Sequence, residues 1–315
     1  MRLPGLASLA KVLAVVPLLG VAELVLHVKE TTVDVVPDKD WTAARDGVVK
    51  DLKPDDLVTF APFWADPLGR RSFGEEIMTM RRSARSDEAR FARAWEVSIR
   101  GAHDSTLERW KKVSEQKYGA VTVTLFENPA PEKVFTDLVE LVTESRLSVS
   151  RVDANGVESP CTFQHGATAG GSTVVPQGLL VPADKFVCAS GGHAGVTVLH
   201  DLTHHPRLCI NTNVGSGGTM RLKFSGVTFG ESIVGHSGIQ WMSERGPSKD
   251  VATIAFSAND RPIAVHTHRH GTGWINFELP TPELAGKRAD LVADVGGNVN
   301  RYFCFEATTR TRASQ

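Results

Sequence analysis

Six residues in two runs, each with a spacing of two positions, form the group in this chain with the clearest potential for chemistry. In chain order they are His266, His268, His270, Trp274, Asn276 and Glu278. Residues two apart on a β-strand share one face, so residues 251–256, 262–270 and 274–279 are predicted to be strands that present this group together. The opposite face of these strands is apolar and is predicted to cover a core; it carries Ile254, Phe256, Ile263, Val265, Ile275, Phe277 and Leu279.

Three interpretations of the histidine face are open. It is a solvated face of an antiparallel sheet, or a ligand platform on which Trp274 stacks while the imidazoles, Asn276 and Glu278 form hydrogen bonds. Alternatively, His266, His268 and His270 bind zinc or another divalent metal, which requires a further ligand that no spacing identifies. No other cofactor is expected.

Composition limits the classes of function. The chain has 315 residues, enough for two domains, and its 41% hydrophobic and 23% charged residues are typical of globular protein. A formal net charge of −1 argues against general nucleic-acid binding, which needs a basic surface.

The cysteines indicate an oxidising compartment. All four lie beyond residue 160, without a CxxC pair and without a neighbouring histidine, so redox catalysis and thiolate metal binding are disfavoured. An even number in one β-rich domain suits two disulfides. Of the three possible pairings we expect Cys161–Cys188 and Cys209–Cys304.

Residues 1–30 are predicted to export the chain. Arg2 and Lys11 precede an apolar run that continues to Val28. This pattern fits a single-pass membrane helix with the bulk of the chain on the extracytoplasmic side, periplasmic or extracellular. The small residues of positions 20–22 leave a cleaved signal peptide as the alternative.

Residues 31–130 are predicted to form a small α/β domain with a parallel sheet. Strands are expected at 57–61, 94–99 and 121–126, with helices at 41–52, 69–93 and 107–116. Ligands of such sheets bind outside the carboxyl ends of the strands. The polar and aromatic residues expected at those ends, and hence in a cleft, are Trp64, Asp66, Arg70, Arg100, His103, Asp104 and Glu127.

The second half of the chain is predicted to be an antiparallel β-sandwich. Residues 131–150 have the spacing of a helical connector, and short β segments separated by turn residues recur over 151–315. The expected fold class is therefore α+β with two domains: an N-terminal membrane helix, a small α/β domain and a jelly-roll-like, disulfide-containing sandwich.

Three resemblances add expectations. Residues 40–70, DWTAARDGVVKDLKPDDLVTFAPFWADPLGR, resemble the soluble segment of dolichyl-phosphate-mannose-type glycosyltransferases, without the membrane bundle that holds that family's catalytic acids. Residues 207–310, with MRLKFSGVTFGESIVGHSGI and GTGWINFELPTPELAGKRADLVADV, resemble galactose-binding-like jelly-roll modules. That resemblance implies a glycan site at His236, Gln240 and Trp241 and around residues 270–274. The arrangement as a whole resembles bacterial single-span membrane proteins, which implies no activity.

Catalytic motifs are missing from the sequence. Residues 235–238, GHSG, lack the second glycine of a nucleophile elbow, and residues 213–218 lack the ending of a P-loop. The sequence therefore favours an extracytoplasmic protein whose sandwich binds a glycan or an envelope protein without catalysis. The alternatives are an accessory or enzymatic component of glycan processing that uses the α/β cleft, and a metal-binding protein.

Overall fold

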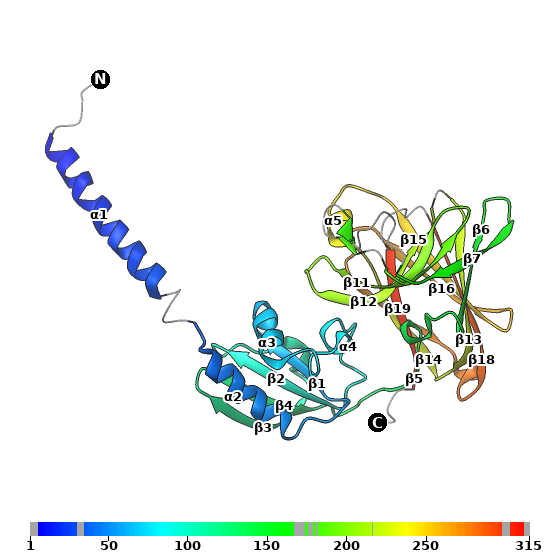
Figure 1. Ribbon diagram of the computed structural model, residues 1–315, viewed down its shortest axis with the longest axis horizontal. Coiled ribbons are helices and arrows are strands. Elements are labelled where there is room, and N and C mark those ends of the chain that lie inside the picture. Colours follow the sequence, from blue (N-terminus) through cyan, green and yellow to red (C-terminus); the bar gives the residue numbers. More distant parts are fainter. Residues whose placement is uncertain are drawn as a thin grey trace.

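The computed structural model describes residues 6–29, 35–166, 174–175, 179–180, 182–215, 217–297 and 303–311 (Figure 1). A first helix, α1 (Leu6–Val28), stands apart from two folded units. In the described part of the chain, no helix is both long enough and apolar enough to cross a bilayer, so the anchor expected over residues 1–30 is not supported.

The N-terminal unit consists of a four-stranded sheet and short helices. Its elements are α2 (Asp38–Val49), β1 (Leu57–Ala61), η2 (Phe63–Ala65), α3 (Asp66–Phe73), α4 (Met80–Ser83), β2 (Arg93–Ile99), η3 (Ser105–Leu107), β3 (Lys111–Tyr118) and β4 (Val121–Glu127). Helices α2 and α3 contact one another, and α3 also packs on β1. Phe60 of β1 meets Trp41 and Phe73 edge to face, with ring centroids 6.3 and 5.3 Å apart.

The sheet of this unit is mixed, which corrects the predicted parallel sheet. Its strand order is β1-β2-β4-β3, and only β1 and β2 run parallel. The helix predicted at residues 107–116 is wrong, because β3 occupies most of that segment. A turn at Gly119, where φ is +61°, joins β3 to β4. A connection this short makes the neighbouring strands antiparallel, since a parallel crossover needs a dozen or so residues.

The second unit is a β-sandwich, which confirms that part of the predicted fold. Its elements are β5 (Lys133–Asp137), η4 (Val139–Leu141), β6 (Leu147–Val152), β7 (Glu158–Gln164), β8 (Val174–Val175), β9 (Leu179–Leu180), β10 (Lys185–Cys188), β11 (His193–His200), β12 (Pro206–Asn213), β13 (Thr219–Thr228), β14 (Ser232–Ile239), α5 (Trp241–Glu244), β15 (Val251–Ala258), β16 (Arg261–Arg269), β17 (Ile275–Pro280), η6 (Pro282–Leu284), β18 (Arg288–Gly297) and β19 (Phe303–Thr311).

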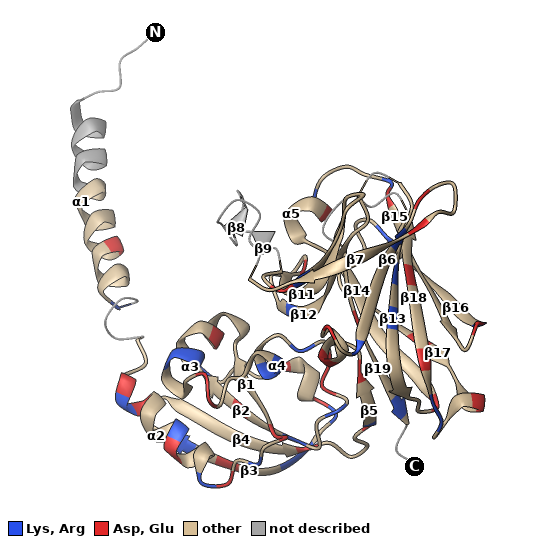
Figure 2. Cartoon of the chain, turned by 45° about the vertical axis from the view of Figure 1, so that its right-hand side comes forward, with Lys and Arg blue, Asp and Glu red and all other residues tan. Residues whose placement is uncertain are grey.

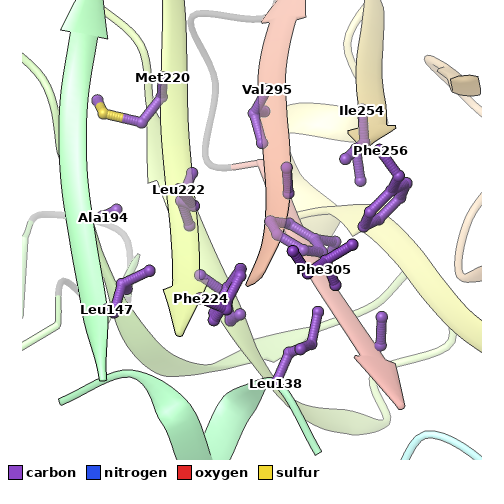
Figure 3. Packing of buried hydrophobic residues seen from close by; sticks show 14 of the residues in the cluster. Leu138, Leu147, Ala194, Met220, Leu222, Phe224, Ile254, Phe256, Val295 and Phe305 are labelled. Carbon is purple, nitrogen blue, oxygen red and sulfur yellow. The ribbon is translucent and has the colours of Figure 1, made fainter. Parts of the chain in front are cut away.

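Antiparallel pairing runs through the sandwich in the order β16-β15-β18-β13-β6-β7-β10-β11-β12-β19-β14-β17. The path folds over so that its two ends, β16 and β17, also approach one another. Side chains from opposite layers fill the interior, where Phe224, Phe256 and Phe305 are buried (Figure 3). Alternation of buried and less buried residues along β15 and β18 matches a sheet with one core face.

The segment between the two units is a strand rather than the predicted helix. Residues 133–137 form β5, which pairs with the end of β19, and only the single turn η4 is helical. The spacing of Val134, Leu138 and Leu141 suited a helix, but Leu138 instead enters the sandwich core, and its backbone N–H donates to the carbonyl of Ala307 at 2.9 Å. The connector is therefore built into the sandwich.

Both predicted disulfides are confirmed. Cys161 and Cys188 lie directly opposite one another on β7 and β10. Cys209 and Cys304 join the neighbouring strands β12 and β19 and are fully buried. These two bonds account for all four cysteines of the sequence.

Candidate functional site

A cleft of about 310 Å³ lies where the N-terminal unit meets the sandwich. Helix α4 is at this junction, in contact with both β1 and β12 (Figure 2). The residues lining the cleft are Thr59, Phe60, Ala61, Phe63, Asp66, Ser83, Arg85, Glu88, His103, Asp104, Ser105, Thr106, His205, Pro206 and Arg207. Both units therefore supply polar side chains to one concave surface.

The parallel pair β1 and β2 positions the wall that comes from the N-terminal unit. Ala61 at the end of β1 lies opposite Ser98 of β2, so both strands end at the same edge of the sheet. Asp66 follows β1, and His103 and Asp104 follow β2, which brings these three predicted residues to the cleft.

Glu96, in the middle of β2, fixes the turn that carries His103 and Asp104. Its carboxylate accepts the backbone N–H of Asp104 at 2.7 Å and lies 2.6 Å from His103 Nδ1. The turn passes through Arg100, with φ of +57°, so it needs such an internal tie. Burial raises the pKa of Glu96 above its ordinary value, although its hydrogen bonds oppose that shift.

Asp104 is held in its ionised form. Burial raises its pKa, but hydrogen bonds from Thr59 and Thr106 and the charge of Arg85 outweigh burial, so the pKa of Asp104 is lowered. The hydroxyl of Thr59 donates to it at 2.6 Å, and Arg85 approaches to 3.7 Å. The cleft thus contains a carboxylate in a fixed orientation.

A tight loop before β12 brings His205 into the cleft from the sandwich. The buried carboxylate of Asp201 accepts the backbone N–H of Thr203 at 2.9 Å and that of His205 at 3.0 Å. The His205 ring then lies against Phe63, with centroids 3.9 Å apart. Burial lowers the pKa of His205, which favours the neutral imidazole.

Two arginines tie the walls together. Arg207 donates from Nε to Asp201 at 2.9 Å and from Nη1 to the backbone carbonyl of Arg85 at 2.7 Å. Arg85 in turn donates to Glu88 at 2.9 Å. Each guanidinium therefore faces the cleft from an anchored position.

Four of the residues predicted for the α/β cleft do not line it. Trp64 projects beside Arg100, whose guanidinium lies 5.4 Å from the indole centroid. Arg70 pairs with Asp66, donating from Nε at 2.6 Å. Glu127 lies opposite Arg93 at the start of β2, at the other end of the sheet, because β4 runs antiparallel to β2.

The histidine face is inverted on β16. His266 and His268 are buried, whereas Val265 is 62% exposed, the reverse of the prediction. Pairing with β15 shifts between Phe256 and Ser257, where the β16 partners jump from Ala264 to Pro262. This bulge adds one residue to β16, and a shift of one residue exchanges the two faces of a strand.

The two buried histidines share one hydroxyl. Ser237 Oγ is 2.8 Å from His266 Nε2 and 3.0 Å from His268 Nδ1. On its other side, His268 Nε2 lies 3.6 Å from Glu244 Oε1. The four side chains are buried and form a polar network inside the sandwich.

The remaining members of the predicted face do not form an open platform. His270 Nε2 is 3.0 Å from the carbonyl of Ser243. Trp274 packs on the Cys209–Cys304 cluster and stacks with His236 at 6.0 Å. Asn276 and Glu278 are exposed on β17, as predicted.

The loop implied by the jelly-roll resemblance is mostly strand and helix. His236 lies within β14, buried, with Nδ1 2.6 Å from Glu306. Gln240 caps α5 by accepting the backbone N–H groups of Met242 and Ser243 at 3.0 and 3.1 Å. Trp241 contacts His204, with ring centroids 4.7 Å apart.

The metal interpretation is not supported. Within the described residues, no group of three or more histidine, cysteine, aspartate or glutamate side chains is arranged to hold a metal ion. His266 and His268 meet the hydroxyl of Ser237 instead of converging on a shared open position.

Four cleft residues were not foreseen from the sequence: Phe63, Arg85, His205 and Arg207. Glu96, which does not line the cleft but holds His103 and Asp104 in place, was not foreseen either. Two local signals pointed to them. The pattern Asp201-x-Thr203 is typical of a turn in which a carboxylate caps the backbone, and a charged residue within a strand, as Glu96 is, requires a partner when buried.

Comparisons with known proteins give only slight likenesses. No family model and no curated protein matches the chain. The C-terminal family 22 carbohydrate binding module of Clostridium thermocellum Xyn10B is similar at 6% identity and a TM-score of 0.25, covering 57% of this chain and 95% of that one. TmCBM61 in complex with beta-1,4-galactotriose is similar at 13% identity and a TM-score of 0.24, covering 38% and 82%.

A third match, the CBM22-1–GH10 modules of the Clostridium thermocellum xylanase, has 10% identity and a TM-score of 0.27, covers 38% of this chain and spans only 25% of that chain. Similarities of this size carry no argument about ligand or activity. The expected resemblance to glycosyltransferases and to single-span membrane proteins is not shown by these comparisons.

Proposed function

We propose that the protein is an exported binding protein whose cleft between the N-terminal unit and the sandwich takes a sugar ring or a similar polyhydroxylated ligand. The observation that carries the proposal is the pairing of an aromatic surface with fixed polar groups. Phe63 and His205 form the surface, and Asp104 and Arg85 stand beside it in fixed orientations.

The chemistry of these groups suits hydroxyl-rich ligands. A hydroxyl both donates and accepts, so it pairs with a carboxylate on one side and a guanidinium on the other. The apolar face of a sugar ring packs on an aromatic side chain. A volume of about 310 Å³ is at the lower end of small-molecule sites.

Export is supported by the sulfur chemistry. Two disulfides with no free cysteine are typical of proteins that fold in an oxidising compartment. Thiol titration of the protein isolated from its native cell checks this part: no free thiol is expected, and four titratable thiols would contradict it.

The binding proposal is tested with two neighbouring aromatic residues. Phe63 and Trp64 are 45% and 54% exposed on the same turn, but only Phe63 lines the cleft. A glycan array with the wild-type protein identifies the ligand, and calorimetry measures its affinity in Phe63→Ala and Trp64→Ala. We expect Phe63→Ala to weaken binding by about tenfold or more and Trp64→Ala to leave it almost unchanged.

Two results would end the proposal. One is the absence of any glycan bound by the wild-type protein at any concentration tested. The other is binding that survives Phe63→Ala but is lost in Trp64→Ala, which would place the ligand outside the cleft.

One observation favours a second candidate function, the processing of the bound glycan. A carboxylate that orients an imidazole is the arrangement of a general base, and Glu96 lies 2.6 Å from His103 Nδ1 at the cleft. If the protein converts its ligand, Glu96→Gln should lower turnover more than affinity and shift the pH profile. Mass spectrometry of the glycan after incubation with the protein distinguishes processing from binding. The absence of any product with the wild-type protein would exclude this second function.

A further inference from the structure

A second hollow, of about 450 Å³, lies between the connector and the base of the sandwich, apart from the cleft. Its centre is a bulge in β13, where the pairing with β18 shifts between Phe224 and Val227. The bulge frees the backbone carbonyls of Ser225 and Gly226 from the sheet ladder. These carbonyls require donors from elsewhere.

Two arginines supply those donors from opposite sides of β13. Arg146 precedes β6 and donates from Nη2 to the carbonyls of Ser225 at 3.0 Å and Gly226 at 3.3 Å. Arg288 begins β18 and donates from Nε to the same Gly226 oxygen at 3.1 Å. Two guanidinium groups therefore face one another across a single carbonyl oxygen.

Glycine at position 226 makes this approach possible. Its φ is +64°, and a Cβ atom there would lie 2.7 Å from Nε and Nη2 of Arg288. Any other residue would be strained and would displace the arginine. Glycine at this position of the bulge therefore leaves the space that the Arg288 guanidinium occupies.

The carboxylates that line the hollow are paired with arginines other than Arg146 and Arg288. Asp137 accepts from Arg90 at 2.9 Å, and Glu140 pairs with Arg81. Asp290, beside the bulge, pairs with Lys223 at 3.4 Å and accepts the N–H of Gly226. Within the described residues, neither Arg146 nor Arg288 has a carboxylate within ion-pair distance.

We infer that this hollow binds one oxyanion group, a carboxylate, sulfate or phosphate, held between Arg146 and Arg288. Two like charges this close repel, and an anion between them converts repulsion into two charge-assisted contacts. Arg146 holds the carbonyls with Nε and Nη2, and Arg288 holds Gly226 with Nε, so further N–H groups of each planar fork are left for the ligand. Phe135 and Leu141 form an apolar side, which suits an anion carried on a carbon framework.

The test uses the full chain and three probes: sodium sulfate, sodium phosphate and sodium glucuronate, each against sodium chloride at equal ionic strength. Sulfate stabilises proteins in general by exclusion from their surface, so saturable heat in calorimetry is the readout rather than melting temperature alone. We expect at least one probe to bind, and Arg146→Gln and Arg288→Gln each to weaken it by about tenfold or more.

Arg261→Gln is the matched control, because Arg261 is an exposed arginine on the hairpin between β15 and β16 of the same sandwich. It should bind the probe as the wild type does. Arg288→Lys keeps the charge but removes the fork, and should bind more weakly than wild type while folding normally. The probe that binds best identifies the kind of oxyanion.

Absence of saturable binding for all three probes would overturn the inference, as would equal binding by Arg288→Gln and wild type. Either result would mean that the two arginines serve only to cap the bulge. The cleft variant Phe63→Ala should bind the anion normally, so this site and the proposed glycan cleft succeed or fail separately.

Discussion

His266 shows how a single buried side chain can make stability depend on pH. The imidazole of His266 lies 2.8 Å from Ser237 Oγ and stacks on Phe277 at 4.3 Å. Burial, with the nearby His268 adding to it, lowers the pKa of His266 from 6.5 to about 4. The folded protein thus keeps this residue neutral where the unfolded chain would protonate it.

This predicts a loss of stability as the pH falls from 6.5 towards 4. In that interval the unfolded chain binds a proton at His266 that the folded chain does not, so the free energy of unfolding decreases by at most about 1.4 kcal/mol per pH unit from this site. Above pH 6.5 the contribution is constant. Urea unfolding from about pH 7 to about pH 5, above the range where carboxylates of ordinary pKa titrate, measures the slope.

Replacing His266 isolates its contribution to the slope of stability against pH. This is needed because His193 and His205 also have lowered pKa values and shift stability in the same direction. His266→Gln should have a shallower slope than wild type. Identical slopes in the two proteins would show that the pH dependence has another source.

At the scale of the element, the two disulfides differ in the length of chain they close. Cys161–Cys188 spans 27 positions and Cys209–Cys304 spans 95. A crosslink that closes a longer loop restricts the unfolded chain more, by about 1 kcal/mol for this difference. Replacing both cysteines of the longer pair by serine should therefore lower the free energy of unfolding more than the same change in the shorter pair.

Chemical denaturation of the two double variants measures this. Cys209 and Cys304 are also fully buried, so serine at these positions leaves unsatisfied hydroxyls. This increases the difference in the free energy of unfolding between the two double variants. A larger loss from the Cys161–Cys188 variant would contradict the expectation.

The elements also show what a sequence can and cannot predict. Alternation over 251–256 and 274–279 placed Phe256 and Phe277 correctly in the core, because those strands carry no irregularity in that stretch. On β16 one extra residue reversed the faces, and nothing in a single sequence marks a bulge of this kind. The spacing of apolar residues in the β3 and β5 segments is compatible with a helix. These segments form strands because β3 pairs with β4 and β5 pairs with β19.

Some residues of the candidate site could be predicted from the sequence and others could not. Asp66, His103 and Asp104 were predictable because strand ends of a parallel pair meet at one edge. His205 and Arg207 belong to the other unit, and their place in the cleft depends on how the two units dock, which local patterns do not encode.

At the scale of the whole molecule, a second arginine of the sandwich, besides Arg207, contacts the N-terminal unit. Arg310 of β19 is buried and pairs with Asp87 at 2.8 Å and with Glu132 at 2.9 Å. Burial alone would raise the pKa of Asp87, but the charge and hydrogen bonds of Arg310 outweigh it and lower that pKa. Asp87 lies in the N-terminal unit, so its ion pair with Arg310 crosses the junction, while Glu132 lies in the connector just before β5.

We expect Arg310→Gln to destabilise the protein by about 1–3 kcal/mol, because it leaves the half-buried carboxylates of Asp87 and Glu132 without their charged partner. The contact between the N-terminal unit and the sandwich should also weaken in this variant. A protease should therefore cut the junction around residues 128–132 faster, and the ligand of the cleft should bind more weakly. Limited proteolysis and calorimetry measure both effects. An unchanged midpoint of unfolding, with unchanged cleavage, would contradict the expectation.

The pairing of β5 with β19 determines how the chain can be divided. Strand β12 covers the first part of one edge of β19 and β5 covers the last part. A recombinant sandwich that starts at residue 151 would leave half of that edge bare, and such an edge is a template on which copies of a chain associate. The connector therefore belongs structurally to the sandwich. A soluble fragment of the sandwich has to begin before Lys133.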